Sequence, residues 1–244
     1  EGHATLRWRE PSSETEVRAL VSRRFDVLCV DVQRQGDGAV EQAIQWELSR
    51  ANLPENPAVE ARADDGVCYL TQRFAAGGGY TVAITALKGA CVAEVHDARI
   101  SGRFVPDGAG ALAVILTIVS TEDSPDTEVE AVRRLVGATE AGPELVANDH
   151  ASWWQEYWQR GLASVGDQSV ERLYYTSLYL TASTLRAGKQ SPGLQGLWVG
   201  ENVPPWNADF HSNVNIQCVY WGLFTNNRLD LVEPYLRHYH RTAD

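Results

Sequence analysis

Residues 191–221 read SPGLQGLWVGENVPPWNADFHSNVNIQCVYW, a segment that is mostly without helical or strand periodicity. It gathers aromatic, amide, imidazole and carboxylate side chains: Trp198, Trp206, Trp221, Asn213, Asn215, His211 and Asp209. A loop of this composition is costly to leave exposed, and loops that carry function have this character. Flat tryptophan faces cover the C–H surfaces of a sugar, and amides or imidazoles hydrogen-bond to its hydroxyls. The segment therefore favours a carbohydrate as ligand.

The two asparagines of this segment, Asn213 and Asn215, are separated only by Val214. On a helix, residues two apart point roughly 200° away from each other, so the pair could share a ligand only in extended chain or at a helix entrance. We therefore expect Asn213 to end the loop and Asn215 to lie in the first turn of the next helix. The alternative is that Ser212 or Asn213 simply caps that helix. Spacing alone leaves both interpretations open.

Helical periodicity surrounds the loop. Residues 127–136 have helical spacing with acidic residues in the first turn, and we expect helix again from residue 148, with His150 as a surface or capping residue at its start. Residues 214–224 and 228–241 predict two further helices. Residues 168–186 predict another, with one side that we expect to face the core: Val170, Leu173, Tyr174, Ser177, Leu178 and Thr181.

The first half of the chain is predicted to be β-structure. Five segments are rich in β-forming residues: 25–32, 67–74, 80–87, 99–105 and 111–119. Gly77-Gly78-Gly79 is a hairpin signal, and Pro106-Asp107-Gly108 has turn chemistry between the last two strands. Residues 15–24 fit either a helix or an irregular strand. Short strands at close spacing predict an antiparallel β-sandwich.

Composition limits the classes of partner. The 244 residues are 44% apolar, enough for one large domain or two small ones, and carry a net charge of −11 with a pI near 5.0. Such an acidic chain is a poor partner for nucleic acid or an anionic membrane surface. No apolar run reaches transmembrane length. The sequence gives no indication of oligomeric state.

The four cysteines are scattered along the chain. They lack CxxC spacing, which disfavours a zinc site: Cys29, Cys68, Cys91 and Cys218. Separate buried thiols are the simpler interpretation, and a disulfide is the open alternative. Because the residues of the loop are amides and aromatics, no metal or cofactor is predicted.

The chain begins at Glu1 and contains no methionine. We therefore expect both ends to be cuts in a longer protein. No signal peptide is visible, although a trimmed polypeptide would not show one.

Four short motifs together resemble glycoside hydrolase family 95: GLQGLW at 193–198, PPW at 204–206, DFHSNVNIQ at 209–217 and YW at 220–221. Each motif alone is weak, but the combination is specific. The family contains inverting α-L-fucosidases and some α-L-galactosidases. Upstream, LYYTSLYL at 173–180 also fits. The resemblance is strong over 149–244 and only architectural over 1–120.

The resemblance implies three domains. They are an N-terminal antiparallel β-sandwich at 1–120, a helical linker at 121–148, and the first helices of an (α/α)6 catalytic barrel at 149–244. It implies a glycoside hydrolase that removes terminal α-L-fucosyl or α-L-galactosyl residues from an oligosaccharide or glycoconjugate with inversion. Family habit also implies a location outside the cytoplasm: secreted, periplasmic or at the cell surface.

The resemblance also assigns roles to the residues of the loop. Asn213 and Asn215 would act in catalysis, positioning and activating the attacking water together with a distant aspartate. The substrate would be bound or the pocket shaped by five side chains: His211, Trp206, Asp209, Trp198 and Trp221. The family's general-acid glutamate and assisting aspartate lie downstream of Asp244, so we expect these 244 residues alone to be inactive.

Departures from the family pattern bear on specificity. Gly193 stands where the family has asparagine, Phe210 replaces a tyrosine, and Leu178 lies near the place of a family arginine. Fucose and galactose differ only by a hydroxyl at C6, so one pocket contact could decide between them. The alternative function is a carbohydrate-binding or scaffold protein with a degenerate pocket, which predicts sugar binding without turnover even in the complete protein.

Overall fold

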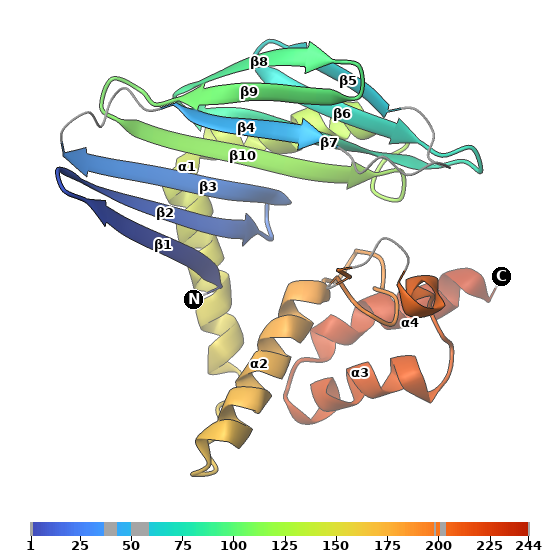
Figure 1. The fold of residues 1–244 in the computed structure, drawn as a ribbon. Coiled ribbons are helices and arrows are strands. Elements are labelled where there is room, and N and C mark those ends of the chain that lie inside the picture. The colour runs from blue at the N-terminus through green and yellow to red at the C-terminus, as the bar shows by residue number, and fades with distance from the viewer. Residues whose placement is uncertain (1, 37–42, 50–58, 198, 201–203, 244) are drawn as a thin grey trace. The chain divides into compact units, whose positions relative to one another are not determined.

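The computed structural model describes residues 2–36, 43–49, 59–197, 199–200 and 204–243. The chain divides into two compact units, residues 1–154 and 155–244. The first unit contains the sheets and most of the first helix, and the second contains the remaining helices (Figure 1). No helix among the described residues combines the length and the apolar character needed to cross a membrane.

Two antiparallel sheets make up the β-structure of the described residues. The larger has seven strands in the order β1-β2-β3-β10-β7-β6-β5, and the smaller has three in the order β4-β9-β8. The strand bounds are β1 His3–Glu10, β2 Ser13–Ser22, β3 Val27–Gly36, β4 Ile44–Ser49, β5 Val59–Asp64, β6 Val67–Arg73, β7 Gly79–Lys88, β8 Ala90–His96, β9 Arg99–Val105 and β10 Ala111–Ser120. The small sheet packs on the larger one, which confirms the predicted antiparallel β-structure with two packed layers.

Strand β10 is apolar on both faces because both faces are covered along most of its length, Ile118 being the exposed exception. Its side chains alternate between two cores, as the two-residue period of a strand requires. Leu112 and Val114 enter the core between the two sheets, whereas Ile115 and Val119 enter the core on the opposite face of the large sheet. The continuous apolar run at 111–119 therefore reflects a central strand between two layers.

Helix α1 (Thr127–Gln159) covers that opposite face. Four of its residues, at helical spacing, are buried against the sheet: Ala131, Leu135, Ala138 and Val146. The helix is two segments joined by a kink, because Gly142 has φ 76° and is followed by Pro143. Asp126 accepts a hydrogen bond from the Val129 backbone N–H at 3.1 Å and caps the first turn. The predicted acidic first turn is confirmed by Glu128 and Glu130.

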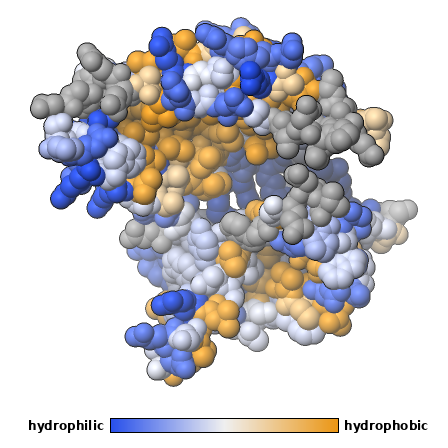
Figure 2. All heavy atoms as spheres, viewed as in Figure 1, coloured by the Kyte–Doolittle hydropathy of each residue, from blue (hydrophilic) through white to orange (hydrophobic). Residues whose placement is uncertain are grey.

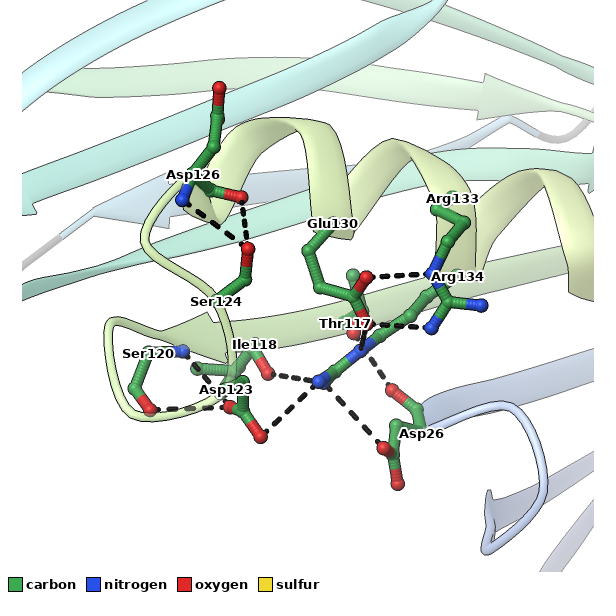
Figure 3. A network of polar contacts seen from close by, with 10 residues as sticks. All are labelled: Asp26, Thr117, Ile118, Ser120, Asp123, Ser124, Asp126, Glu130, Arg133 and Arg134. Atoms are coloured by element: carbon green, nitrogen blue, oxygen red, sulfur yellow. Dashed lines mark hydrogen bonds and ion pairs between the residues drawn. The ribbon is translucent and has the colours of Figure 1, made fainter.

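A buried arginine fastens the beginning of α1 to the sheet (Figure 3). Arg134 forms ion pairs with Glu130 at 2.9 Å, Asp123 at 3.3 Å and Asp26 at 3.8 Å. It also donates to the Ile118 carbonyl of β10 at 3.2 Å. Hydrogen bonds from Arg133 and Arg134 outweigh burial and lower the pKa of Glu130 to about 2. One guanidinium thus joins the helix, the chain that leads into it and two parts of the sheet.

One face of the large sheet is apolar and exposed over its first strands. Figure 2 shows hydrophobic side chains gathered over β1, β2, β3 and β10. Leu6 and Val21 are both 62% exposed on this face, and Ile118 of β10 is 58% exposed. Register places Leu6 beside Val17 and Val21 beside Leu28, so the apolar positions run across neighbouring strands.

The second unit consists of short helices around a small core. Their bounds are α2 Gln168–Thr184, η1 Pro205–Ala208, α3 Val214–Thr225, η2 Leu229–Val232 and α4 Glu233–Thr242. Buried apolar side chains come from the end of α1 and from α2, α3 and η2: Tyr157, Leu178, Ala182, Leu185, Ile216, Tyr220, Leu223, Leu231 and Val232. Arg228 is also fully buried, where it donates to the Tyr157 carbonyl at 3.1 Å and lies over the Tyr157 ring.

Several expectations about local structure are corrected. The strands before and after Pro106-Asp107-Gly108 exist, but β9 belongs to the small sheet and β10 to the large one, so this turn carries the chain between sheets. Residues 15–24 mostly form strand β2. His150 is buried in the middle of α1, where its Nε2 lies 2.9 Å from the Gly2 carbonyl oxygen. Leu173, expected in the core, is 70% exposed on α2.

Candidate functional site

The loop that precedes α3 is closed by contacts between its two limbs. The Leu194 backbone N–H donates to the Asp209 carbonyl at 3.2 Å, and the Gln195 side-chain amide donates to the Pro205 carbonyl at 2.9 Å. A Cβ atom on Gly193 would overlap the Ala208 carbonyl oxygen. Glycine at 193 therefore allows the close approach of the limbs, and an asparagine there would require the loop to shift.

The loop backbone is strained beside its tryptophan. Trp206, Asn207 and Ala208 are consecutive non-glycine residues with φ of 50°, 54° and 54°. Each left-handed residue of this kind costs roughly 1–2 kcal/mol, and such strain clusters at functional sites. The surrounding contacts hold the conformation, including the Asp209 N–H bonded to the Trp206 carbonyl at 3.0 Å. The Trp206 side chain remains 69% exposed.

An aromatic cluster tethers the loop to α4. The Phe210 ring lies 3.8 Å from the His238 ring, centroid to centroid, and the Tyr235 ring lies 4.6 Å from that of Tyr220. The Tyr220 hydroxyl meets Ser191 Oγ at 2.6 Å, so the beginning of the loop is held by α3. Burial raises the pKa of Tyr220, which keeps it a neutral hydrogen-bonding group. The site is therefore supported by packed side chains on two helices.

The asparagine pair lies where the loop meets α3. Asn213 is the N-cap residue, and its Oδ1 accepts a hydrogen bond from the Asn215 backbone N–H at 3.0 Å. Asn215 lies in the first turn of α3, as expected from the sequence. Both side chains are exposed. Among the described residues the Asn215 side chain has no hydrogen-bond partner, so its amide is free for a ligand.

His211 lies beside the asparagine pair, and its ring contacts Trp206. The His211 carbonyl accepts from the Asn213 N–H at 2.8 Å, and its ring meets the edge of Trp206 at 6.3 Å between centroids. The His211 Nε2 is buried and has no partner among the described residues. Asp209 has an exposed side chain, and its backbone closes the loop.

The other two predicted tryptophans are placed differently. Trp221 is 56% exposed on the second turn of α3. Its position is six residues beyond Asn215, which puts it about 120° around the helix from that asparagine. The structure therefore does not bring Trp221 to the same helix face as Asn215. Trp198 lies outside the described residues.

Sequence reasoning missed the residues that support the loop. Tyr235, His238 and Tyr239 lie on α4, and all three rings contact Phe210. Their spacing of three and four residues is the signal of a common helix face and could have indicated an aromatic side of this helix. It does not indicate that the face packs on the loop, because this requires the tertiary structure.

Comparison with known proteins finds a family match in the C-terminal part of the chain. Residues 140–244 match the glycosyl hydrolase family 95 catalytic domain. "Probable alpha-fucosidase A" of Aspergillus niger is 39% identical over 70 residues, which are 28% of this chain and 9% of that protein. "Alpha-L-fucosidase 2" of Arabidopsis thaliana is 38% identical over 65 residues, 27% of this chain and 8% of that protein. The chain is thus matched over less than a tenth of either relative.

The fold also resembles a solved structure. A protein described as "Putative kojibiose phosphorylase from human microbiome" superimposes on this chain with a TM-score of 0.62 and 11% sequence identity. The superposition covers 80% of this chain and 29% of the chain of that protein. At this identity the likeness concerns the fold alone, an antiparallel β-region followed by helices. Residues 140–244, which include the loop with Asn213 and Asn215, therefore resemble the catalytic domain of glycoside hydrolase family 95.

Proposed function

We propose that the protein to which this chain belongs is an inverting glycosidase that removes terminal α-L-fucosyl or α-L-galactosyl residues from oligosaccharides or glycoconjugates outside the cytoplasm. The observation that carries the proposal is the exposed pair Asn213 and Asn215 at the beginning of α3, within the segment that matches the family. The names of the two relatives support fucose as the first sugar to test.

The proposed architecture follows the same relation. Residues 1–120 form the sandwich domain, 121–148 a helical linker, and 149–244 the first helices of an (α/α)6 barrel. The successive helices α2, α3 and α4 support this assignment, because such a barrel is built from consecutive helices. The second segment of α1 runs through residue 149 without a break, so the linker and the first barrel helix are continuous.

In the proposed inverting hydrolysis, the two asparagines hold the attacking water. Inversion needs a base on the face of the sugar opposite the acid, with room for a water molecule between them. Asn213 Oδ1 accepts a hydrogen bond from the Asn215 N–H with one lone pair, and its second lone pair can accept one from water. An amide is a weak base, so a carboxylate must polarise it; we place that aspartate and the general-acid glutamate downstream of Asp244.

The remaining residues serve the sugar. Trp206 presents an exposed ring that can cover a C–H face, and the unpartnered His211 Nε2 can bind a hydroxyl. Asp209 offers an exposed carboxylate, and the roles of Trp198 and Trp221 in the pocket rest on the family resemblance alone. No metal or cofactor enters this chemistry.

The test uses the complete protein with an aryl α-L-fucoside and the matching α-L-galactoside. Asn213→Ser keeps a good N-cap but removes the amide, and Asn215→Ala removes the second amide. We expect each to lower kcat by roughly 100-fold or more, the usual contribution of a general base. Asn227→Gly is the control, because Asn227 is an exposed asparagine beyond the other end of α3 with φ 55°, which glycine adopts freely.

Four results test the proposal. Wild-type rates in both variants would remove the proposed roles, and sugar binding without turnover in the complete wild-type protein would favour a binding function instead. The anomer released first, followed by NMR, must be the β-sugar if the reaction inverts. The isolated 244 residues should show no turnover above buffer.

A further inference from the structure

Two of the four cysteines face each other across the core between the sheets. Cys68 lies on β6 of the large sheet and Cys91 on β8 of the small sheet, and their Sγ atoms are 4.0 Å apart. The two strands do not pair with each other, so the contact joins separate layers. Cys29 lies in the core on the other face of the large sheet, and Cys218 is exposed on α3 of the second unit.

The surroundings of the pair are apolar. Five buried side chains share its core: Ile84, Ile100, Phe104, Leu112 and Val114. Within the described part of the chain, each of the two thiols has only the other as its hydrogen-bond partner. Cys68 is 1% exposed, whereas Cys91 is partly exposed. A small reagent can therefore reach Cys91 first, with Cys68 directly behind it.

We propose that Cys68 and Cys91 are a redox pair that closes into a disulfide between the two sheets when the protein meets a small-molecule disulfide oxidant. The sulfurs must approach from 4.0 Å to about 2.05 Å, a movement that side-chain rotation and a small adjustment of the layers can supply. Cys29 and Cys218 are excluded from the pair by their places in the fold.

The reaction is two successive exchanges. The Cys91 thiolate attacks one sulfur of glutathione disulfide, forms a mixed disulfide and releases one glutathione thiolate. Cys68 then loses its proton to solvent and attacks the Cys91 sulfur, releasing the second glutathione. Two protein thiols give up two protons and two electrons, and one glutathione disulfide becomes two molecules of glutathione.

The direction of attack agrees with the electrostatics of the pair. The hydrogen bond from Cys68 lowers the pKa of Cys91 despite its partial burial, so Cys91 is the better nucleophile. The same contact, together with burial, raises the pKa of Cys68, which makes it the resolving thiol. Cys29, with a pKa raised by burial to about 11, stays unreactive.

The bond would strengthen attachment of the small sheet. It closes the chain between positions separated by 23 residues and ties β8 directly to β6. Loop closure of this length typically raises the melting temperature of a domain of this size by several degrees, roughly 5 °C or more if the geometry is unstrained. After reduction of the Cys68–Cys91 disulfide, packing alone would again hold β8 against β6.

The experiment incubates the folded protein with glutathione disulfide, blocks remaining thiols with N-ethylmaleimide in denaturant, and maps tryptic peptides by mass spectrometry. Cleavage after Arg62, Arg73, Lys88 and Arg99 isolates Cys68 in peptide 63–73 and Cys91 in peptide 89–99. We expect these two peptides to be linked, and a higher Tm that a reductant reverses. Cys91→Ser should abolish both, whereas the control Cys218→Ser should leave both unchanged.

Alternative results overturn the proposal. Both peptides recovered as N-ethylmaleimide adducts would show that the thiols do not close. Glutathione retained on Cys91 without the linked peptide would show that Cys68 cannot resolve it. A link from Cys91 to any other cysteine would assign the bond elsewhere. The readout is covalent, so it does not depend on whether the Cys91→Ser variant folds as well as wild type.

Discussion

Replacement of Arg134 by methionine should weaken the first unit far more than the same replacement one residue earlier. Arg134 has a side chain only 5% exposed and contacts three carboxylates and the Ile118 carbonyl (Figure 3). Methionine keeps the apolar stem and removes the guanidinium. The three carboxylates, 17–22% exposed, then lose the cation that they share, while Glu130 keeps its hydrogen bonds from Arg133.

The magnitude follows from this burial. Removal of one partner from a buried ion cluster costs about 3–5 kcal/mol. Because the carboxylates retain some contact with water, we expect the lower end of that range, about 3 kcal/mol. Arg133 provides the matched control, since it also hydrogen-bonds to Glu130 but is 71% exposed. An exposed pair within one helix contributes about 0.3–0.5 kcal/mol, so Arg133→Met should have a small effect.

Urea unfolding measures both variants. Far-UV circular dichroism gives the free energy of unfolding, and amide hydrogen exchange of peptides from β10 and α1 assigns the loss to the first unit. The reasoning is refuted if Arg134→Met costs less than about 1 kcal/mol, or if Arg133→Met costs the same. A large effect confined to peptides of the second unit would also refute it.

Two further predictions concern a buried histidine and a close backbone approach. Burial lowers the pKa of His150 below its usual 6.5, so the unfolded chain binds the proton more readily than the folded chain. The free energy of unfolding should therefore fall as the pH drops below about 6.5, and His150→Gln should remove this loss between pH 5 and 7. Urea titrations at several pH values measure both effects. Gly193→Ala should destabilise the loop by about 1–3 kcal/mol, because its Cβ overlaps the Ala208 carbonyl, and should speed proteolysis there. Gly200→Ala is its control, since nothing lies within 4 Å of the added carbon; equal proteolysis of the two variants would contradict the packing argument.

Sequence patterns located the strands that carry apolar side chains on buried faces and missed the others. The hairpin of β6 and β7 was predictable because its glycines permit the turn and both strands are rich in buried residues. Strand β1 is exposed at every position, and β4 and β8 are mostly exposed. Strand β1 shows no alternation of burial to detect, and in β4 and β8 the inward positions are only half-buried, so the apolar signal is weak.

Turn residues and helical periodicity also could not show which strands pair or which helix positions are buried. The turn at Pro106-Asp107-Gly108 has the residues of a hairpin, yet β9 and β10 enter different sheets. On α2 the period of 3.6 residues was visible, but the helix buries Leu178 and Ala182 while Leu173 stays exposed. A repeat shows that a face exists, and the packing of distant segments determines which part of it is covered.

At the candidate site, the capping interpretation and the ligand interpretation apply differently to the two asparagines. Helix capping fully accounts for Asn213 at this position, because its Oδ1 satisfies an N–H at the beginning of α3. It does not account for Asn215, whose side chain makes no hydrogen bond among the described residues, so that another helix-forming residue would lose none there. A cap and a water ligand are also compatible in one amide, since the oxygen has two lone pairs. Asn215 is therefore the more discriminating position: if it only occupies a helix turn, Asn215→Ala should stabilise α3 slightly and leave kcat unchanged, whereas the proposed role requires the rate to fall while stability holds.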